Sequence, residues 1–415
     1  MKKLYETRIT FDPKSVPQEV KGVLLRGEFL FYKSNLTGHT DETGMVENDP
    51  KYTPYQYEDG MDSIGGFYVD EMTLQEDGTY AVTYQLPAGV YPYGFILNPE
   101  FAEKPVSDNP RLAAFKILNG KGEEVWLKDF DQMMDPSYKC DYNIMISDPA
   151  NPPVAPTVTG VQTNSELYVG DEAECAALPA KDPSIRGTMT YLSYTDVEGR
   201  TQSIAVYLPA GYDKTRTYPL VLVSHGGGGN EADWPSQGSI GNIMDHLTAQ
   251  GRTKEAILVC MNNTVYSKGF GNWDFAAIAR NCEEAVIPFV EKIFNVSKDV
   301  KDRAFCGLSM GSMTTLYMYM HRAEVYQYFG AFSGGIAEGN PYFSLEDPHL
   351  KDVTLMIGTA EEDIAYNERN IGVPPTIRAL KAKGLPYIPY FTTGSHDWFC
   401  WPQMFEYFAE HVLWK

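Results

Sequence analysis

The hydrophobic positions of this chain follow two different patterns, and the change between them lies near residue 189. From Arg8 to about Ser147, short apolar or alternating runs are broken by Gly, Asp, Asn and Pro, as in GFYVDEMTL and DGTYAVTYQL. Alternation with a period of two indicates strands, and the Asp77-Gly78 pair between such runs indicates a hairpin. Since no helical pattern of normal length occurs here, we expect an all-β domain, an antiparallel β-sandwich, over residues 1–147.

A proline-rich stretch follows this half. The segment SDPANPPVAPTVTG places four prolines between Ser147 and Gly160. Proline-rich segments are stiff and extended. We therefore expect residues 148–188 to form a linker and a segment that wraps one of the two domains.

From residue 189 to residue 415, apolar strands alternate with helical patterns. Strands are expected at SIAVYLP, PLVLVSHGG, EAILVCMNN, DRAFCGL, YFGAFSGG, VTLMIGTA and YIPYFTTG. Helices are expected near 238–250, over 276–293, from Met310, near 369–384 and over 401–413. Such alternation predicts a mainly parallel sheet covered on both faces. Right-handed crossovers then make it an open, doubly wound α/β fold.

The pentapeptide Gly307-Leu308-Ser309-Met310-Gly311 lies where an expected strand, RAFCGL, meets an expected helix. A G-x-S-x-G motif alone is weak evidence, but a strand-to-helix turn is the position that a nucleophile elbow requires. The two glycines allow strand and helix to approach each other without Cβ clashes. Ser309 is therefore a candidate nucleophile, and the backbone N–H of Met310 is a candidate oxyanion donor.

A serine nucleophile needs a base, and the base needs an acid that orients it. In open α/β sheets, loops at the carboxyl ends of strands supply these groups. Of the four histidines after Ser309, only His396 directly follows an expected strand, in YFTTGSHDW. The acid should leave the preceding strand, where VTLMIGTAEED offers Glu361, Glu362 and Asp363. The spacing favours Asp363.

The glycine-rich stretch VLVSHGGGGNEADW ends an early strand. A turn of this kind can aim a second backbone N–H at an oxyanion. The competing interpretation is a phosphate-binding loop, but the stretch lacks the G-K-[S/T] that such a loop requires. Aromatic residues close to the motifs can stack on an aryl acyl group, with core packing as an equal alternative for each. They are Trp234, Phe270, Trp273 and Trp398.

The charge of the chain limits its partners. The 415 residues include 34 Lys and Arg against 55 Asp and Glu, for a formal net charge of −21. This acidity argues against nucleic acid and against anionic membrane surfaces as partners. No apolar stretch approaches the length of about 18 residues that a membrane span needs. A serine mechanism needs neither a metal nor an organic cofactor, so we expect none, and the histidines show no H-E-x-x-H or similar ligand spacing.

The first residues, MKKLYETRITFDP, contain two lysines with no apolar segment behind them. A secretory signal peptide requires such a segment. The sequence as it stands therefore predicts a cytoplasmic protein, or a secreted one if a leader has been removed.

Several of these stretches together resemble the esterase D-like carbohydrate esterases, the group that contains feruloyl esterases and acetyl xylan esterases. They are AVYLPAGYDKTRTYPLVLVSHGGGGNEADW, AFCGLSMGSM, GTAEED and GSHDW, and the similarity covers about residues 186–415. The fragments QLPAGVYPYGF and ISDPANPP are similar to the Ig-like, carbohydrate-binding-module-like domain often fused ahead of such esterases. The resemblance implies an α/β-hydrolase domain preceded by that β-domain.

The resemblance also implies roles for single residues. Ser309 would be the nucleophile, His396 the base and Asp363 the acid, and Met310 and Gly227 would form the oxyanion hole. One position departs from the usual G-L-S-M-G-G, since Ser312 stands in the last place. That glycine normally eases close helix packing. Because serine is small, we expect a tolerated change.

The substrate implied by the resemblance is plant cell-wall polysaccharide or a feruloylated oligosaccharide, with feruloyl esters of arabinoxylan as the first expectation. Three alternatives stay open. They are an acetyl xylan esterase, a siderophore esterase of the same fold with an N-terminal β-domain, and a non-catalytic carbohydrate-binding protein with a decayed esterase half. An acetyl ester would need a smaller acyl pocket than a feruloyl ester. The intact Ser309, His396 and acid cluster argue against a decayed esterase.

Overall fold

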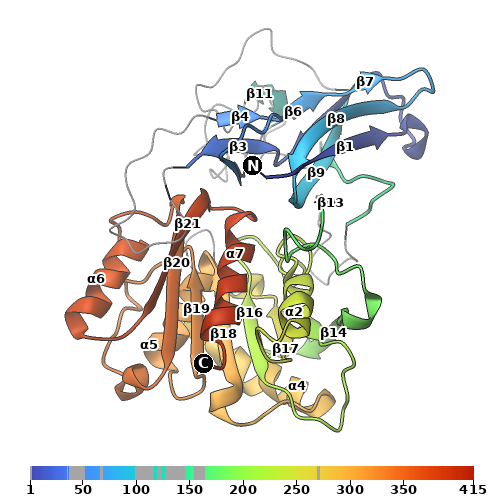
Figure 1. Cartoon of the computed structure of the whole chain (residues 1–415). Coiled ribbons are helices and arrows are strands. Elements are labelled where there is room, and N and C mark those ends of the chain that lie inside the picture. The colour runs from blue at the N-terminus through green and yellow to red at the C-terminus, as the bar shows by residue number, and fades with distance from the viewer. Residues whose placement is uncertain are drawn as a thin grey trace. The chain divides into compact units, whose positions relative to one another are not determined.

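The computed structural model describes residues 2–34, 36, 52–65, 69–98, 116–118, 124–126, 145–153, 164–268 and 272–415 (Figure 1). The chain divides into two compact units, which are described separately. The first comprises Met1–Ser34, Asp49–Ala155 and Val161–Cys175. The second comprises Asn35–Asn48, Pro156–Gly160 and Ala176–Lys415. The domain ranges predicted above stay predictions.

The first unit is built from antiparallel β-sheets. Their strand orders are β1-β8-β7, β12-β9-β2-β6 with β13 also paired to β9, β4-β3-β5, and β10-β11. The strands are β1 (Leu4–Phe11), β2 (Val23–Gly27), β3 (Leu30–Lys33), β4 (Tyr52–Pro54), β5 (Met61–Ile64), β6 (Val69–Glu71), β7 (Thr73–Leu74), β8 (Tyr80–Pro87), β9 (Gly89–Leu97), β10 (Lys116–Leu118), β11 (Glu124–Trp126), β12 (Met145–Ile146) and β13 (Ser165–Val169). The predicted hairpin joins β7 to β8, with Gly78 at φ +87°. That this unit is an Ig-like sandwich stays a prediction.

The second unit contains one eight-stranded sheet of order β14-β15-β17-β16-β18-β19-β20-β21. Its strands are β14 (Thr188–Thr195), β15 (Thr201–Leu208), β16 (Leu220–Ser224), β17 (Ile257–Met261), β18 (Arg303–Leu308), β19 (Tyr328–Phe332), β20 (Thr354–Glu362) and β21 (Ile388–Ser395). β15 is antiparallel to both of its neighbours, and all strands from β17 to β21 are parallel. This order is that of the α/β-hydrolase fold, and it confirms the predicted mainly parallel sheet.

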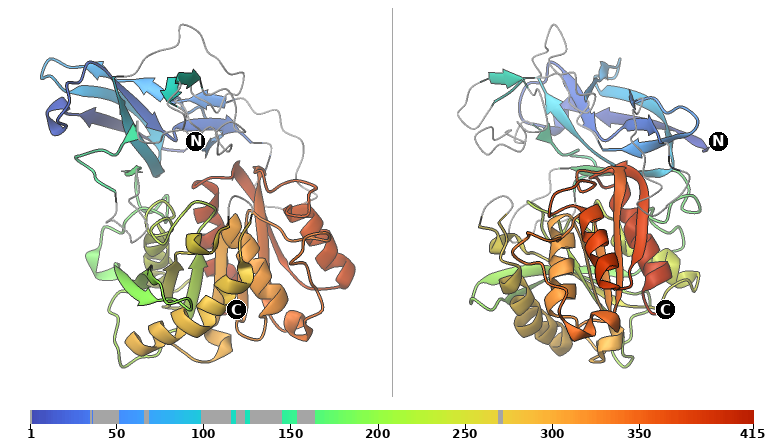
Figure 2. Two further views of the ribbon diagram at one scale, coloured as in Figure 1. Left: turned by 180° about the vertical axis from the view of Figure 1, so that it is seen from behind. Right: turned by 90° about the vertical axis from the view of Figure 1, so that its left-hand side faces the viewer.

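Helices cover both faces of this sheet (Figure 2). They are α2 (Ile240–Ala249), α3 (Phe275–Asn281), α4 (Ile287–Ile293), α5 (Met310–His321), α6 (Val373–Lys383) and α7 (Cys400–Tyr407). The helix predicted over 276–293 is one run in which a π-helical turn, Cys282–Val286, joins α3 to α4. A second π-helical turn, Phe408–Val412, follows α7. Among the residues described, none of the helices has the length and apolar character of a membrane span.

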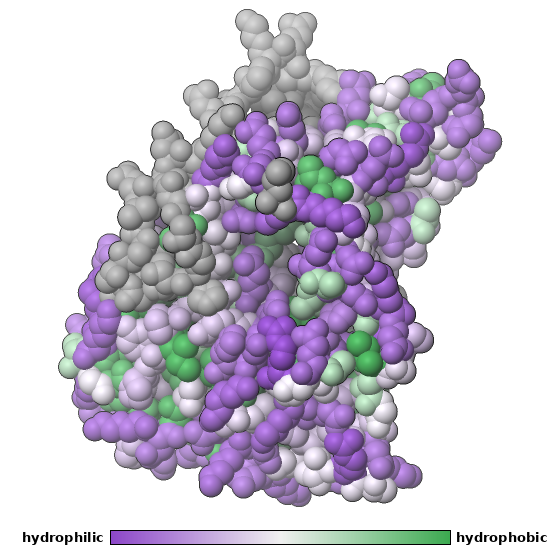
Figure 3. All heavy atoms as spheres, in the orientation of Figure 1, coloured by the Kyte–Doolittle hydropathy of each residue, from purple (hydrophilic) through white to green (hydrophobic). Residues whose placement is uncertain are grey.

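The core of the second unit lies along the sheet. β16, β17 and β19 are buried over their whole length, which explains why these segments are continuous apolar runs in the sequence. The face shown in Figure 3 is mostly polar, with apolar side chains in small separate groups. The large apolar side chains that are exposed within the described part are scattered through the sequence: Leu4, Leu74, Tyr168, Ile293, Ile364 and Ile371.

Candidate active site

Ser309 lies between the last residue of β18 and the first residue of α5. Its backbone adopts φ 53° and ψ −115°, a combination that residues with a side chain rarely adopt. The Ser309 N–H donates to the carbonyl of Phe332 on β19 at 2.8 Å, and the Ser309 carbonyl accepts from the N–H of Met313 at 3.0 Å. The turn is therefore held from the neighbouring strand and from the helix that it begins.

The glycines on either side of Ser309 are required by a close approach of β16. A Cβ on Gly307 would lie 2.6 Å from the carbonyl oxygen of Ser224. A Cβ on Gly311 would lie 2.5 Å from the same oxygen and 2.7 Å from that of His225. Carbon and oxygen atoms do not approach so closely without a bond, so neither position has room for a side chain.

Ser312, the residue that departs from the family pattern, is fully buried. Its hydroxyl donates to the carbonyl of Gly334 at 2.8 Å, so no polar group is left unsatisfied there. A Cβ on Gly334 would lie 3.1 Å from the Cβ of Ser312. Glycine at 334 thus leaves space for the extra side chain at 312.

His396 stands directly after β21 and connects Ser309 with Asp363. Its Nε2 lies 2.8 Å from the Ser309 hydroxyl, and its Nδ1 lies 2.8 Å from Oδ1 of Asp363. An ionised carboxylate only accepts, so Nδ1 carries the proton and Nε2 is free to accept the proton of the serine. The structure therefore brings together the three residues that the sequence assigned to this site.

Asp363 is the first residue after β20, and its side chain is fully buried. Burial alone would raise the pKa of its carboxyl, but the adjacent His396 and the N–H of Ala365, which donates to Oδ1 at 2.8 Å, lower it below its usual value. Asp363 is therefore ionised at neutral pH. Glu361 and Glu362 are the last two residues of β20 and are only half-buried.

The two candidate oxyanion donors come from different parts of the chain, one directly after Ser309 and one from the loop after β16. Met310 is the first residue of α5, where an N–H group has no acceptor within its own helix. Gly227 belongs to the glycine-rich loop that follows β16. The Met310 N–H thus stands at a helix start, which suits it to bind a developing negative charge, and the oxyanion role of Gly227 stays a prediction.

His225 ties the glycine-rich loop to the end of β17, a role that the sequence did not predict. Its Nε2 accepts from the backbone N–H of Asn263 at 2.9 Å, so its Nδ1 carries the proton and donates to the carbonyl of Gly226 at 2.6 Å. Burial lowers the pKa of His225 to about 4. The imidazole is therefore neutral at physiological pH and acts as a fixed cross-link.

The four aromatic residues proposed as substrate contacts lie in different environments. Trp273 is half-buried, and a Cβ on Gly227 would lie 3.1 Å from its Cζ2, so the indole lies beside the predicted oxyanion loop. Trp398 is half-buried two residues after His396. Trp234 is only 1% exposed and donates its indole N–H to the Ser224 carbonyl at 3.0 Å, so it offers no surface to a substrate and supports the end of β16.

The remaining aromatic candidate, Phe270, lies outside the described residues. Its position therefore stays a prediction from the sequence alone.

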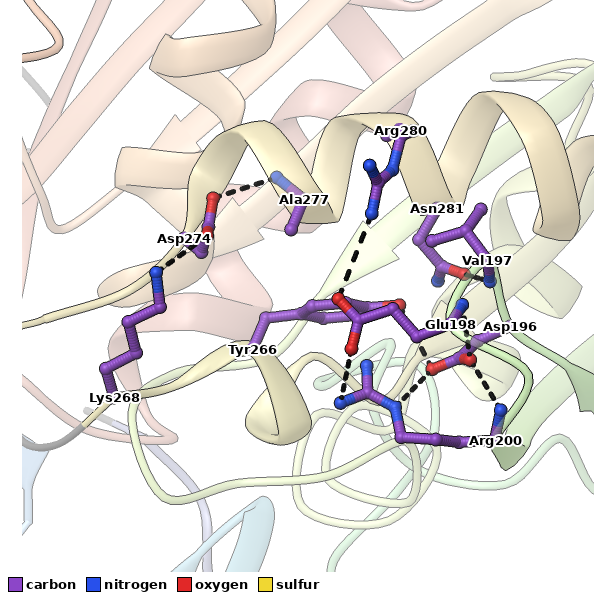
Figure 4. A network of polar contacts seen from close by, with 10 residues as sticks. All are labelled: Asp196, Val197, Glu198, Arg200, Tyr266, Lys268, Asp274, Ala277, Arg280 and Asn281. Atoms are coloured by element: carbon purple, nitrogen blue, oxygen red, sulfur yellow. Dashed lines mark hydrogen bonds and ion pairs between the residues drawn. The ribbon is translucent and has the colours of Figure 1, made fainter.

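A polar network braces the segment that carries Trp273 (Figure 4). Nε of Arg200, in the turn between β14 and β15, lies 2.7 Å from Oδ2 of Asp196, and its guanidinium stacks 4.9 Å from the ring centre of Tyr266. The Tyr266 hydroxyl donates to the same Asp196 oxygen at 3.3 Å. The Tyr266 carbonyl accepts from the N–H of Asp274 at 3.0 Å. Tyr266 and Asp274 are thus joined to each other, and Tyr266 is anchored to the edge hairpin.

Among the described residues, one group of side chains could share a cation: Glu324, Asp347 and His349. Glu324 and His349 are exposed, and Nδ1 of His349 already lies 3.0 Å from Oδ1 of Asp347. Exposed acidic groups of this kind are common without a metal, so no metal site follows from them. The expectation of a metal-free protein stays a prediction.

Comparison with known proteins identifies the family. The family model "Esterase", described as "Putative esterase", matches residues 196–406, just over half of the chain. The chain belongs to this esterase family. The family places it among the carboxylic ester hydrolases, and together with the relatives that follow, it confirms the resemblance to carbohydrate esterases.

The esterase is similar in sequence to two proteins whose names include endo-1,4-beta-xylanase. It is 29% identical over 254 residues to "Endo-1,4-beta-xylanase/feruloyl esterase" of Xylanibacter ruminicola, a match that covers 57% of this chain and 34% of that protein. It is also 29% identical over 230 residues to "Endo-1,4-beta-xylanase Y" of Acetivibrio thermocellus, covering 50% of this chain and 20% of that protein. The matched part of the esterase therefore spans only about a third of the length of the first relative and a fifth of the length of the second.

A solved structure, the CE1 ferulic acid esterase of Anaeromyces mucronatus, is 22% identical to the esterase, with a TM-score of 0.47. The match covers 56% of this chain and 94% of that one.

We expect acid to destabilise the folded esterase in part through His225. Its folded pKa of about 4 lies below its ordinary value of 6.5, so between these two values the unfolded chain binds more protons than the folded one. The contribution of His225 to stability is therefore full above about pH 6.5 and is lost as the pH falls from there through about 4, by on the order of 3 kcal/mol. Urea unfolding at a series of pH values measures the loss.

The matched variant for this experiment is His225→Gln, which removes the titrating group. The difference in unfolding free energy between neutral and acidic pH should be smaller in the variant than in the native chain. An equal difference in both proteins would contradict the assignment of a neutral, buried imidazole.

Proposed function

We propose that this esterase hydrolyses ester-linked acyl groups on plant cell-wall polysaccharide, most readily the feruloyl esters of arabinoxylan. The observation that carries the proposal is the hydrogen-bonded chain from Asp363 through His396 to Ser309, with 2.8 Å at each link, in a member of an esterase family. The similarity to a relative named as a xylanase and feruloyl esterase supports a cell-wall substrate.

The first half of the proposed reaction forms an acyl-enzyme. Nε2 of His396 takes the proton of the Ser309 hydroxyl while the oxygen attacks the carbonyl carbon of the ester. The carbonyl oxygen becomes negatively charged and is bound by the N–H groups of Met310 and Gly227. The bond to the sugar oxygen then breaks, and His396 returns its proton to that oxygen.

The second half releases the acid. Water enters the site, His396 takes one of its protons, and the resulting hydroxide attacks the acyl carbon. Collapse of this second tetrahedral intermediate frees the acid, and the Ser309 oxygen recovers its proton from His396. Asp363, kept ionised by its surroundings, orients the imidazole and stabilises its positive form in both halves. The mechanism uses no metal or organic cofactor.

The preference for an aromatic acyl group rests on the indoles near the site. Trp273 lies against Gly227, and Trp398 follows His396 by two residues. A planar feruloyl ring can stack on an exposed indole face, whereas an acetyl group gains little from one.

For the first unit, the antiparallel sheets are compatible with the proposed Ig-like, carbohydrate-binding-module-like domain, which serves to bring the polysaccharide to the enzyme.

A panel of three esters tests the function. We expect the protein to release ferulate from methyl ferulate and from feruloylated arabinoxylan, and p-nitrophenol from p-nitrophenyl acetate. Ser309→Ala should lower kcat/KM on each ester by about 10³-fold or more, because the reacting oxygen is gone. Release of products can be followed by chromatography and absorbance.

The same panel separates an acetyl esterase and a binding protein from the proposed feruloyl esterase. Cleavage of the acetyl ester without release of ferulate would replace the feruloyl proposal by an acetyl esterase. No cleavage of any ester would favour a binding protein, and native rates in Ser309→Ala would exclude the serine mechanism.

A second series tests which acid orients His396. Asp363→Asn should lower kcat by about 10²- to 10⁴-fold, because an amide cannot hold the imidazole in the required tautomer as a carboxylate does. Glu361→Gln and Glu362→Gln, which change neighbouring half-buried carboxylates, should change kcat by less than about threefold. If either glutamine variant loses more activity than Asp363→Asn, the acid has been assigned to the wrong residue.

A further inference from the structure

Asp397, the residue directly after the candidate base His396, has no role in the proposed reaction. Asp397 lies between β21 and α7 and is only 5% exposed. A buried carboxylate must have donors around it, because an unsatisfied charge in the interior is strongly unfavourable. The identity of those donors shows what the residue holds in place.

Four donors converge on the two oxygens of this carboxylate. Oδ2 accepts from the backbone N–H of Ser395 at 3.1 Å and from the Ser395 hydroxyl at 2.6 Å. Oδ1 accepts from the backbone N–H groups of Phe399 and Cys400, each at 3.0 Å. One oxygen thus reaches back to the residue before His396, and the other reaches forward to the start of α7.

These contacts enclose His396 in a tight loop. The N–H of Asp397 also donates to the Ser395 carbonyl at 3.0 Å, and the Asp397 carbonyl accepts from the N–H of Trp401 at 3.2 Å. The Trp401 ring in turn packs edge-on against the imidazole of His396, with 5.0 Å between the ring centres. The backbone on both sides of His396 and one wall of its imidazole are therefore fixed through the same aspartate.

We propose that Asp397 is a positioning residue, whose carboxylate holds the loop on which His396 bridges Ser309 and Asp363. This role rests on the proposed function, since it assumes that His396 is the base. The geometry of His396 has to be accurate at both nitrogens at once, and displacement of a reacting group by about 1 Å costs on the order of 10²-fold in rate.

The role requires a carboxylate rather than an amide. All four contacts are donated to the carboxylate. Three of the donors are backbone N–H groups, which cannot accept, whereas the Ser395 hydroxyl can do both. Asparagine at this position would turn its NH₂ group toward at least one of these backbone N–H groups and leave that group without an acceptor. Asp397→Asn is therefore close in volume to the native residue but removes part of the anchoring.

The test compares Asp397→Asn with a matched control at a buried aspartate elsewhere in the chain. Asp245 on α2 is also 5% exposed and accepts hydrogen bonds from the Gly187 N–H at 2.7 Å and the Tyr207 hydroxyl at 2.6 Å. Asp245→Asn should lower the unfolding stability but leave kcat on p-nitrophenyl acetate within about twofold of native. Asp397→Asn should lower kcat by about 10- to 100-fold, with KM changed by less than about threefold.

Each outcome of this comparison either supports or overturns the positioning role of Asp397. A folded Asp397→Asn protein whose kcat matches that of Asp245→Asn would overturn the positioning role. If Asp397→Asn does not fold, Ser395→Ala decides, because it removes only the hydroxyl donor of one residue. A kcat about three- to tenfold below native would support the role, and an unchanged kcat would overturn it.

Failure of the underlying function gives a different result. Native activity in Ser309→Ala or His396→Ala would remove the proposed serine mechanism and the positioning role together. Loss of activity in those two variants, combined with native kcat in Asp397→Asn, would remove the positioning role alone.

Discussion

The close packing of the β18–α5 turn against the end of β16 is the constraint on which the site depends. Gly307 and Gly311 have no room for a Cβ because the carbonyl of Ser224 lies in its place. This contact holds Ser309 in a backbone conformation of φ 53° and ψ −115° that it would not otherwise adopt. The strained turn leaves the Ser309 hydroxyl within hydrogen-bond distance of His396 and puts the Met310 N–H at a helix start.

The strand order completes the site. β20 and β21 are neighbours in the sheet, so the residues that follow them, Asp363 and His396, meet although 33 positions separate them. β16 is paired on one side with β17 and on the other with β18, which places the glycine-rich loop next to the serine turn. The loop then needs its own support, which His225 supplies through Asn263 after β17.

Much of this could be predicted from the sequence, because parallel strands with short loops convert order along the chain into proximity at one sheet edge. That logic identified Ser309, His396 and Asp363 as a group. It could not separate Trp234, which packs in the core, from Trp273, which borders the site, since both are aromatic residues near a motif. The roles of His225 and Asp397 also escaped prediction, as they depend on backbone donors that come together only in the folded loop. The sequence predicted one helix over 276–293 and did not indicate the π-helical turn at Cys282–Val286.

The central claim is that the environment of Ser309, through His396, makes its hydroxyl a nucleophile. The most direct measurement treats the folded protein with a fluorophosphonate reagent and locates the adduct by peptide mass spectrometry. The account predicts a single modified residue, Ser309, and labelling slowed by about 10²-fold or more in a folded His396→Ala variant. An adduct on another residue, or equal labelling rates in the native and His396→Ala proteins, would contradict it.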